Sequence, residues 1–147
     1  MAVQIMRLVL YGPPRTKKNS QQILQNKATG RAFIAPSAAY KAYERDCLRQ
    51  ISGLYRAGLA EPVNLRAIYY MPTRRRVDLV NLLEATNDIL VHAGVLADDH
   101  SGIIVSHDGS RVRYDKSNPR VEIVIEEAWG DDTDKGAPGA GVYRARG

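Results

Sequence analysis

Three consecutive arginines, Arg74 to Arg76, lie immediately before Val77 and Asp78 in this chain of 147 residues. Enzymes that cut phosphodiester bonds with Mg²⁺ combine cations that hold the phosphate with two to four carboxylates that hold the metal ion, which polarises the phosphate and activates water. The chain offers both kinds of group. The candidate metal ligands are Asp78, Glu84, Asp88, Asp98 and Asp99, and the candidate phosphate ligands are Arg74, Arg75, Arg76, Lys17 and Lys18.

A plainer interpretation is that Asp78 only caps a helix and that the other charges form a solvated surface. Other chemistries find less support in the sequence. His92, His100 and His107 lack the paired spacing of a structural zinc site, and the single cysteine, Cys47, is distant in sequence. No serine has a convincing base partner, and glycine-rich nucleotide-binding loops are absent.

The segment from Asp78 to Ala93 is the most informative predicted helix. At about 100° per residue it has two distinct faces. The apolar face consists of Leu79, Leu82, Leu83, Ile89, Leu90 and Ala93, and the polar face of Asp78, Asn81, Glu84, Asp88 and His92. Gly94 is a natural helix end. We therefore expect Asp98 and Asp99 to fold back past Gly94 toward the polar face.

Periodicity and turn residues predict the remaining elements. Strands are expected at residues 4–11, 22–25, 31–34, 63–70 and 120–126, a helix at about 38–55, and a hairpin from residues 103–106 and 111–114. The segments 22–25 and 31–34 are expected to form another hairpin. Residues 130–147 lack periodicity, so we expect one domain over 1–129 and a flexible tail over 130–147.

Charge divides the chain into two unlike halves. Residues 1–76 hold 14 Lys and Arg against 3 acidic residues, whereas residues 77–147 hold 7 against 13. A cationic first half favours a polyanion such as nucleic acid as partner. No apolar run approaches the roughly 20 residues that span a bilayer, and one cysteine allows no internal disulfide, so we expect a cytoplasmic protein without a membrane segment.

Several of these motifs occur together in a known order. The chain has Gly12-Pro13-Pro14, then Lys18-Asn19-Ser20, a tyrosine-bearing helix and Met71-Pro72 before the arginines. The motifs Asp78-Leu79-x-Asn81-Leu82, Asp88, Ala93-Gly94 and Asp98-Asp99 follow. Over roughly residues 3–127 the sequence resembles the RusA family of Holliday junction resolvases, and the spacing from Asp78 to Asp99 is the most specific part of this resemblance.

The resemblance implies a small α/β (α+β) homodimer that binds four-way DNA junctions and cuts symmetrically related strands with Mg²⁺, commonly in phage or prophage recombination and DNA repair. Position by position, it makes Asp78 and Asp99 the strongest metal ligands, with Asp98 beside them, and Asp88 a shared acidic position. Asn19 joins the candidate DNA-binding residues in this way.

Two positions depart from the best-known members. Val80 stands where the family has a second aspartate, and Glu84 stands where it has a lysine. Valine cannot bind a cation, so we expect Glu84, on the same helical face as Asp88, to restore the lost charge. Arg76 or Lys18 is then left to take the lysine's role.

The sequence therefore predicts a small domain with a mixed β-sheet packed by two main helices, and a Mg²⁺-dependent (or Mn²⁺-dependent) endonuclease for four-way junctions. Its candidate catalytic residues are Asp78, Glu84 and Asp99. A homodimer is expected, because a junction needs two symmetric incisions. Two alternatives stay open: a junction- or DNA-binding protein that has lost cleavage through Val80, and a general phosphate-binding module.

Overall fold

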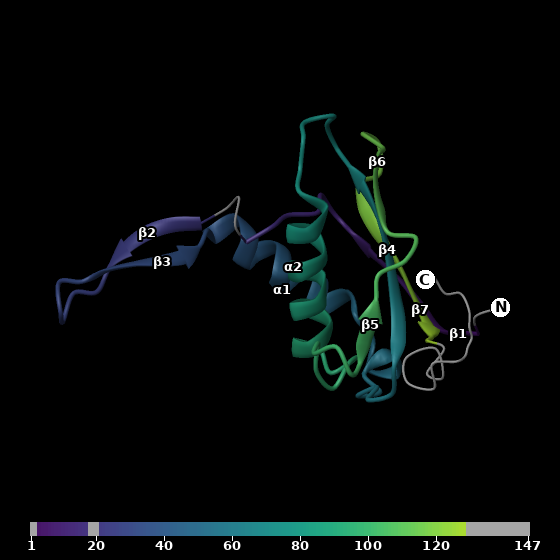
Figure 1. The fold of residues 1–147 in the computed structure, drawn as a ribbon. Helices are drawn as coiled ribbons and strands as arrows, with labels where there is room; N and C mark the ends of the chain where they lie inside the picture. Colours follow the sequence, from purple (N-terminus) through teal and green to yellow (C-terminus); the bar gives the residue numbers. More distant parts are fainter. Residues whose placement is uncertain (1–2, 18–20, 129–147) are drawn as a thin grey trace, which may run out of the picture.

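The computed structural model describes residues 3–17 and 21–128, which form a mixed sheet, two α-helices packed on it, and a separate two-stranded hairpin (Figure 1). In chain order the elements are β1 (Gln4–Tyr11), β2 (Gln21–Gln25), β3 (Ala32–Pro36), α1 (Ala38–Gln50), the 3₁₀ turn η2 (Gly53–Tyr55), β4 (Val63–Met71), α2 (Leu79–His92), β5 (Ile104–Ser106), β6 (Arg111–Tyr114) and β7 (Arg120–Glu127). The predicted mixed sheet with two main helices is confirmed. The predicted tail, 130–147, lies outside the described residues.

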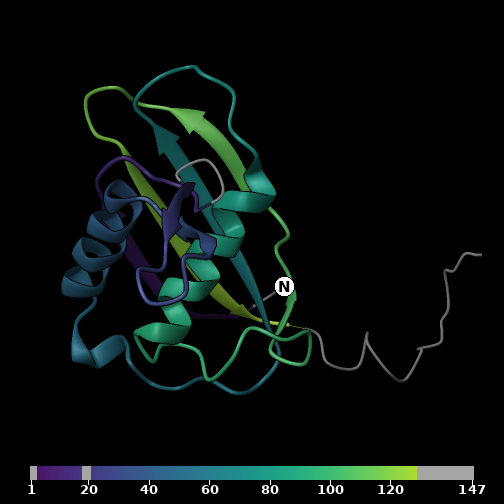
Figure 2. The same ribbon diagram turned by 90° about the vertical axis from the view of Figure 1, so that its left-hand side faces the viewer.

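The sheet is antiparallel at its centre and parallel at one edge. β7 pairs antiparallel with both β1 and β4, whereas β5 and β6 both pair parallel with β4. Both helices cover the same face of this sheet (Figure 2). Among the described residues, no helix packs on the other face of the sheet.

The predicted hairpin of residues 103–106 and 111–114 is wrong, because β5 and β6 follow one another along the same edge of β4. The turn between them does not reverse the chain. Gly109 takes a positive φ of 88°, and the Asn64 side chain accepts hydrogen bonds from the Asp108 amide (2.7 Å) and from the Ser106 hydroxyl (2.6 Å). These contacts hold the connection against β4, so the segment forms an interrupted edge strand.

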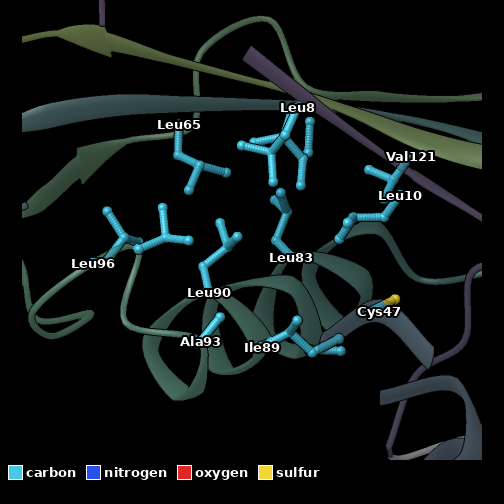
Figure 3. Packing of buried hydrophobic residues seen from close by; sticks show 14 of the residues in the cluster. Leu8, Leu10, Cys47, Leu65, Leu83, Ile89, Leu90, Ala93, Leu96 and Val121 are labelled. Atoms are coloured by element: carbon cyan, nitrogen blue, oxygen red, sulfur yellow. The ribbon is translucent and has the colours of Figure 1, made fainter. Parts of the chain in front are cut away.

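The core lies between the helices and the sheet. β4 and β7 alternate buried and half-buried residues along their length, as expected for strands with one covered face. Leu8, Leu65 and Val121 from the sheet face Leu83 and Leu90 of α2 (Figure 3). Because α2 buries a complete apolar face, its axis is fixed against the sheet, and the segments at its two ends are held apart.

Helix α1 is shorter than predicted: it ends at Gln50 rather than near Tyr55. Arg56 accounts for the end. Its guanidinium donates to the carbonyl oxygens of Leu48 (2.9 Å) and Ile51 (3.2 Å), and also to Ala93 (3.1 Å) at the end of α2. The arginine thus satisfies helix-end carbonyls and ties the two helices together.

The hairpin of β2 and β3 is confirmed and projects from the helical side of the body (Figures 1 and 2). Within the described residues, β2 and β3 form strand pairs only with each other. No described helix is long and apolar enough to cross a membrane.

Candidate metal and DNA-binding site

Asp78 is the N-cap of α2, and the sequence explains why. An aspartate directly before the apolar run of the helix can accept hydrogen bonds from the first free amides, and its charge suits the positive end of the helix dipole. Its Oδ1 accepts from the amides of Val80 (2.9 Å) and Asn81 (3.3 Å). Asp78 is exposed. Both capping hydrogen bonds use Oδ1, so Oδ2 takes no part in capping the helix.

The arginines lie in the loop between β4 and α2, and this loop meets the loop that follows β1. Together they line a groove of about 350 Å³, with Pro13, Pro14, Arg15 and Thr16 on one side and Met71, Pro72, Thr73, Arg75, Arg76 and Val77 on the other. Arg75 and Arg76 are exposed. The groove ends at the residue before Asp78, so three guanidinium groups gather beside the N-terminal end of α2.

Arg15 was not among the predicted site residues. The Gly12-Pro13-Pro14 and Met71-Pro72 motifs lie on opposite sides of the groove, and the sequence alone does not show that they meet.

The edge strand β6 is a second feature that the sequence analysis missed: all four of its residues are exposed, including Arg111 and Arg113. Arg74 lies over the ring of Tyr114 of this strand, 4.1 Å from its centroid. An alternating Arg-Val-Arg-Tyr edge strand beside an arginine loop is a basic surface that sequence could have suggested.

The polar face of α2 is occupied by contacts within the chain. Lys17 forms an ion pair with Asp88, and Glu44 of α1 contacts His92 with an Oε2 to Nδ1 distance of 3.0 Å. Burial raises the pKa of Tyr40, and the nearby carboxylates of Glu44, Asp88 and Glu84 add to the rise. These contacts tie the polar face of α2 to α1 and to the loop that follows β1.

Lys17 and Asp88 were predicted for phosphate and for metal respectively, and the structure brings them to each other instead. The side chains are 34% and 26% exposed, so solvent screens the pair only in part. Lys18 and Asn19 lie outside the described residues.

Asp98 and Asp99 lie at the other end of α2, in the connection to β5. This connection is held near the start of β4, because the Leu59 amide donates to Val95 and the Val63 amide donates to the Ile103 carbonyl (2.7 Å). Asp78, by contrast, follows the end of β4. The α2 helix has 14 residues and is therefore about 21 Å long, with Asp78 before its first residue and the connection to Asp98 and Asp99 after its last.

The expected return of Asp98 and Asp99 toward the polar face is not found in one chain. Figure 1 shows the connection to α2 and the connection from α2 at opposite ends of the helix. Among the described residues, no group of three or more His, Cys, Asp or Glu could hold a metal ion. The described carboxylates of one chain therefore do not form a metal centre by themselves.

Val80 lies on the first turn of α2, where the resemblance places an aspartate, and is 69% exposed. Because the Val80 side chain is mostly in solvent, a charged side chain would fit at this position without a clash. The departure from the family pattern is thus in chemistry and not in packing.

Most of the chain compares well with one family. The family model described as Endodeoxyribonuclease RusA matches residues 12–126. A protein of Enterobacteria phage 82 named crossover junction endodeoxyribonuclease is 40% identical over 121 residues, covering 82% of this chain and 92% of the relative. Proteins of the same name from Shigella sonnei and Escherichia coli K12 are 39% and 38% identical over the same shares. The chain belongs to the RusA family of endodeoxyribonucleases.

Proposed function

We propose that this chain is a structure-selective endodeoxyribonuclease that binds four-way DNA junctions and cuts them in a Mg²⁺-dependent reaction. The observation that carries the proposal is the groove in which Arg15, Arg75 and Arg76 gather next to Asp78. Guanidinium groups bind phosphate oxygens in a forked geometry, and an exposed carboxylate beside the bound phosphate would help hold a metal ion that polarises the phosphodiester and activates water. The relatives named crossover junction endodeoxyribonuclease support four-way junctions as the substrate.

The basic surface extends beyond the groove. Arg74 and the edge strand with Arg111 and Arg113 continue it along the β4 side of the molecule. Because DNA presents one negative charge per about 1.7 Å of duplex axis, a surface of this kind contacts several phosphates at once. The proposed substrate would be met where host or phage DNA is recombined and repaired.

A second candidate function is a junction-binding protein that does not cut. Val80 is the observation that favours it, because a valine occupies the position of a family aspartate and nothing buries it. Under this alternative the arginine groove keeps its role in binding, and only the cleavage step is lost.

The deciding experiment compares a mobile four-way junction with a linear duplex of the same sequence, with EDTA, Mg²⁺ or Mn²⁺. We expect tighter binding to the junction in EDTA and paired, symmetric incisions when either metal ion is added. Junction binding without incision at any metal concentration would favour the binding protein. Equal binding to junction and duplex, with no incision, would leave only the general phosphate-binding module.

A further inference from the structure

The β2–β3 hairpin extends away from the body of the molecule on the side of the helices (Figures 1 and 2). Its two strands have five residues each, so the paired part is about 17 Å long. β2 begins five residues after Thr16, which lines the arginine groove, and β3 leads directly into α1. The base of the hairpin therefore lies near the groove, and its tip lies well away from it.

The tip of the hairpin, residues 26–31, is held by hydrogen bonds within itself. The Asn26 Oδ1 accepts from the amides of Ala28 (2.8 Å) and Thr29 (3.1 Å), and the Gly30 amide donates to the Asn26 carbonyl oxygen (2.7 Å). Gly30 has a positive φ of 73°, which glycine adopts at no steric cost. These contacts set the shape of the tip before any partner binds, and such preorganisation lowers the entropic cost of binding.

The tip carries two cations and no carboxylate. Lys27 and Arg31 are both exposed, and within the described part of the chain neither forms an ion pair. The surrounding sequence has the same sign of charge, because residues 1–43 hold seven Lys and Arg and no Asp or Glu. Charge of one sign on a projecting tip fits a polyanion as partner.

We propose that the β2–β3 hairpin is a second DNA contact, which holds one duplex arm of the junction through phosphates bound by Lys27 and Arg31. This inference rests on the proposed function for the presence of DNA in the arginine groove. The major groove of B-DNA is about 12 Å wide and admits a two-stranded β-ribbon. A hairpin about 17 Å long that starts near the arginine groove is long enough to reach phosphates beyond the branch point.

The composition of the tip favours DNA over a protein surface. The residues between Gln25 and Ala32 are Asn, Lys, Ala, Thr, Gly and Arg, and none of them has a large apolar side chain. The buried core of a protein interface is apolar, often aromatic, and depleted in lysine. Phosphate contacts use exposed cations, hydroxyl groups, amide side chains and backbone amides instead. The tip offers these groups and has no apolar core.

Removing both tip cations tests this contact without cleavage. Lys27→Ala with Arg31→Ala should make the log-log salt slope of junction binding in EDTA shallower by up to about 1.8, and should weaken binding in about 0.1 M NaCl roughly tenfold. Arg45→Ala with Arg49→Ala is the matched control, because it removes the same charge from two exposed positions of α1. Both variants should keep the wild-type melting temperature. A tip variant that changes slope and affinity no more than this control would overturn the proposal.

A cross-linker at the tip locates the DNA directly. Ala28→Cys labelled with benzophenone maleimide should attach, on irradiation in EDTA, to one duplex arm of the junction. Cys47 gives little background, because it is 0% exposed and burial raises its pKa to about 11. The same label at Arg49→Cys, on the last turn of α1, is the matched control and should give much less DNA adduct.

This readout does not depend on incision. Attachment of the Ala28→Cys label to a duplex arm above the control supports the hairpin contact, even if the wild type cuts no junction or binds linear duplex equally well. A tip label that attaches to bound junction no more than the control label, or mainly to a second copy of the chain, would overturn it. A wild-type protein that binds no DNA would overturn both this inference and the proposed function.

Discussion

The two ends of α2 carry the same type of side chain but differ in what surrounds it. At the N-terminal end, Asp78 lies beside a cationic groove and uses one carboxylate oxygen to cap the helix. Toward the C-terminal end, Asp88 is paired with Lys17, and His92 contacts Glu44. A carboxylate stripe in a sequence therefore mixes groups that stabilise the fold with groups available to a ligand, and only their neighbours separate the two kinds.

The sharpest way to break this comparison is Asp78→Asn. Asparagine caps a helix about as well as aspartate, so the fold should stay intact while the charge is lost. Even residues that only support metal ligands typically cost 10–100-fold on mutation, so we expect single-turnover junction cleavage to fall by about a hundredfold or more. Asp88→Asn is the matched control, and a fall in cleavage as large as that of Asp78→Asn would contradict the distinction between the two carboxylates.

Whether the sequence predicts a contact depends on how far apart the two residues lie in the chain. Residue periodicity located β4, β7 and α2, and the start of α2 at Asp78, because each of these features is local. The β5–β6 connection was missed because a glycine with positive φ serves a reversal and a bulge equally, and the Asn64 side chain that decides between them is more than 40 residues away in sequence. The pairing of Lys17 with Asp88 and the position of Arg15 opposite Arg75 are equally non-local.

The separation of Asp78 from Asp99 could have been anticipated from helix length alone. A helix over residues 79–92 with its ligands at both ends places them about 21 Å apart, unless the chain after Gly94 turns back along it. Gly94 does take a positive φ of 78°, but the chain then pairs Leu96 with Leu59 and continues to the start of β4. The pairing of Leu96 with Leu59, and not the glycine, sets the direction of the chain after α2.

Removing cations from the groove should weaken DNA binding and make the affinity less dependent on salt concentration. Each neutralised phosphate contributes a log-log slope of about −0.9, so Arg75→Ala with Arg76→Ala should make the slope shallower by up to about 1.8. Arg49→Ala, an exposed arginine on the last turn of α1, is the matched control and should leave the slope unchanged. Fluorescence anisotropy on a junction over a range of NaCl concentrations measures both, and a slope unaffected by the double substitution would place the DNA elsewhere.

Replacing Val80 by aspartate adds a carboxylate at the N-terminal end of α2, where the family resemblance expects one. Val80→Asp adds a negative charge in the first turn of α2, where the helix dipole favours it by about 0.3–1 kcal/mol, and it replaces an exposed apolar side chain. We expect a small rise in the melting temperature together with faster junction cleavage. If wild-type protein cuts no junction and Val80→Asp does, the non-cleaving binder describes the natural chain.

The smallest expected effect is on the Lys17–Asp88 pair, and it tests whether Lys17 stabilises the fold or holds DNA. The pair is partly exposed, and such pairs contribute about 0.2–1 kcal/mol, so Lys17→Met should lower the free energy of unfolding in urea by no more than about 1 kcal/mol. Methionine keeps the aliphatic length and removes only the charge, and Asp88→Asn should cost a similar amount. In a double-mutant cycle the two losses should not add, because they remove the same interaction. If Lys17→Met instead leaves stability unchanged and makes the salt slope shallower by about 0.9, Lys17 leaves Asp88 for a phosphate when DNA binds. The part of α2 around Asp88 then joins the N-terminal end of the helix as part of the DNA surface.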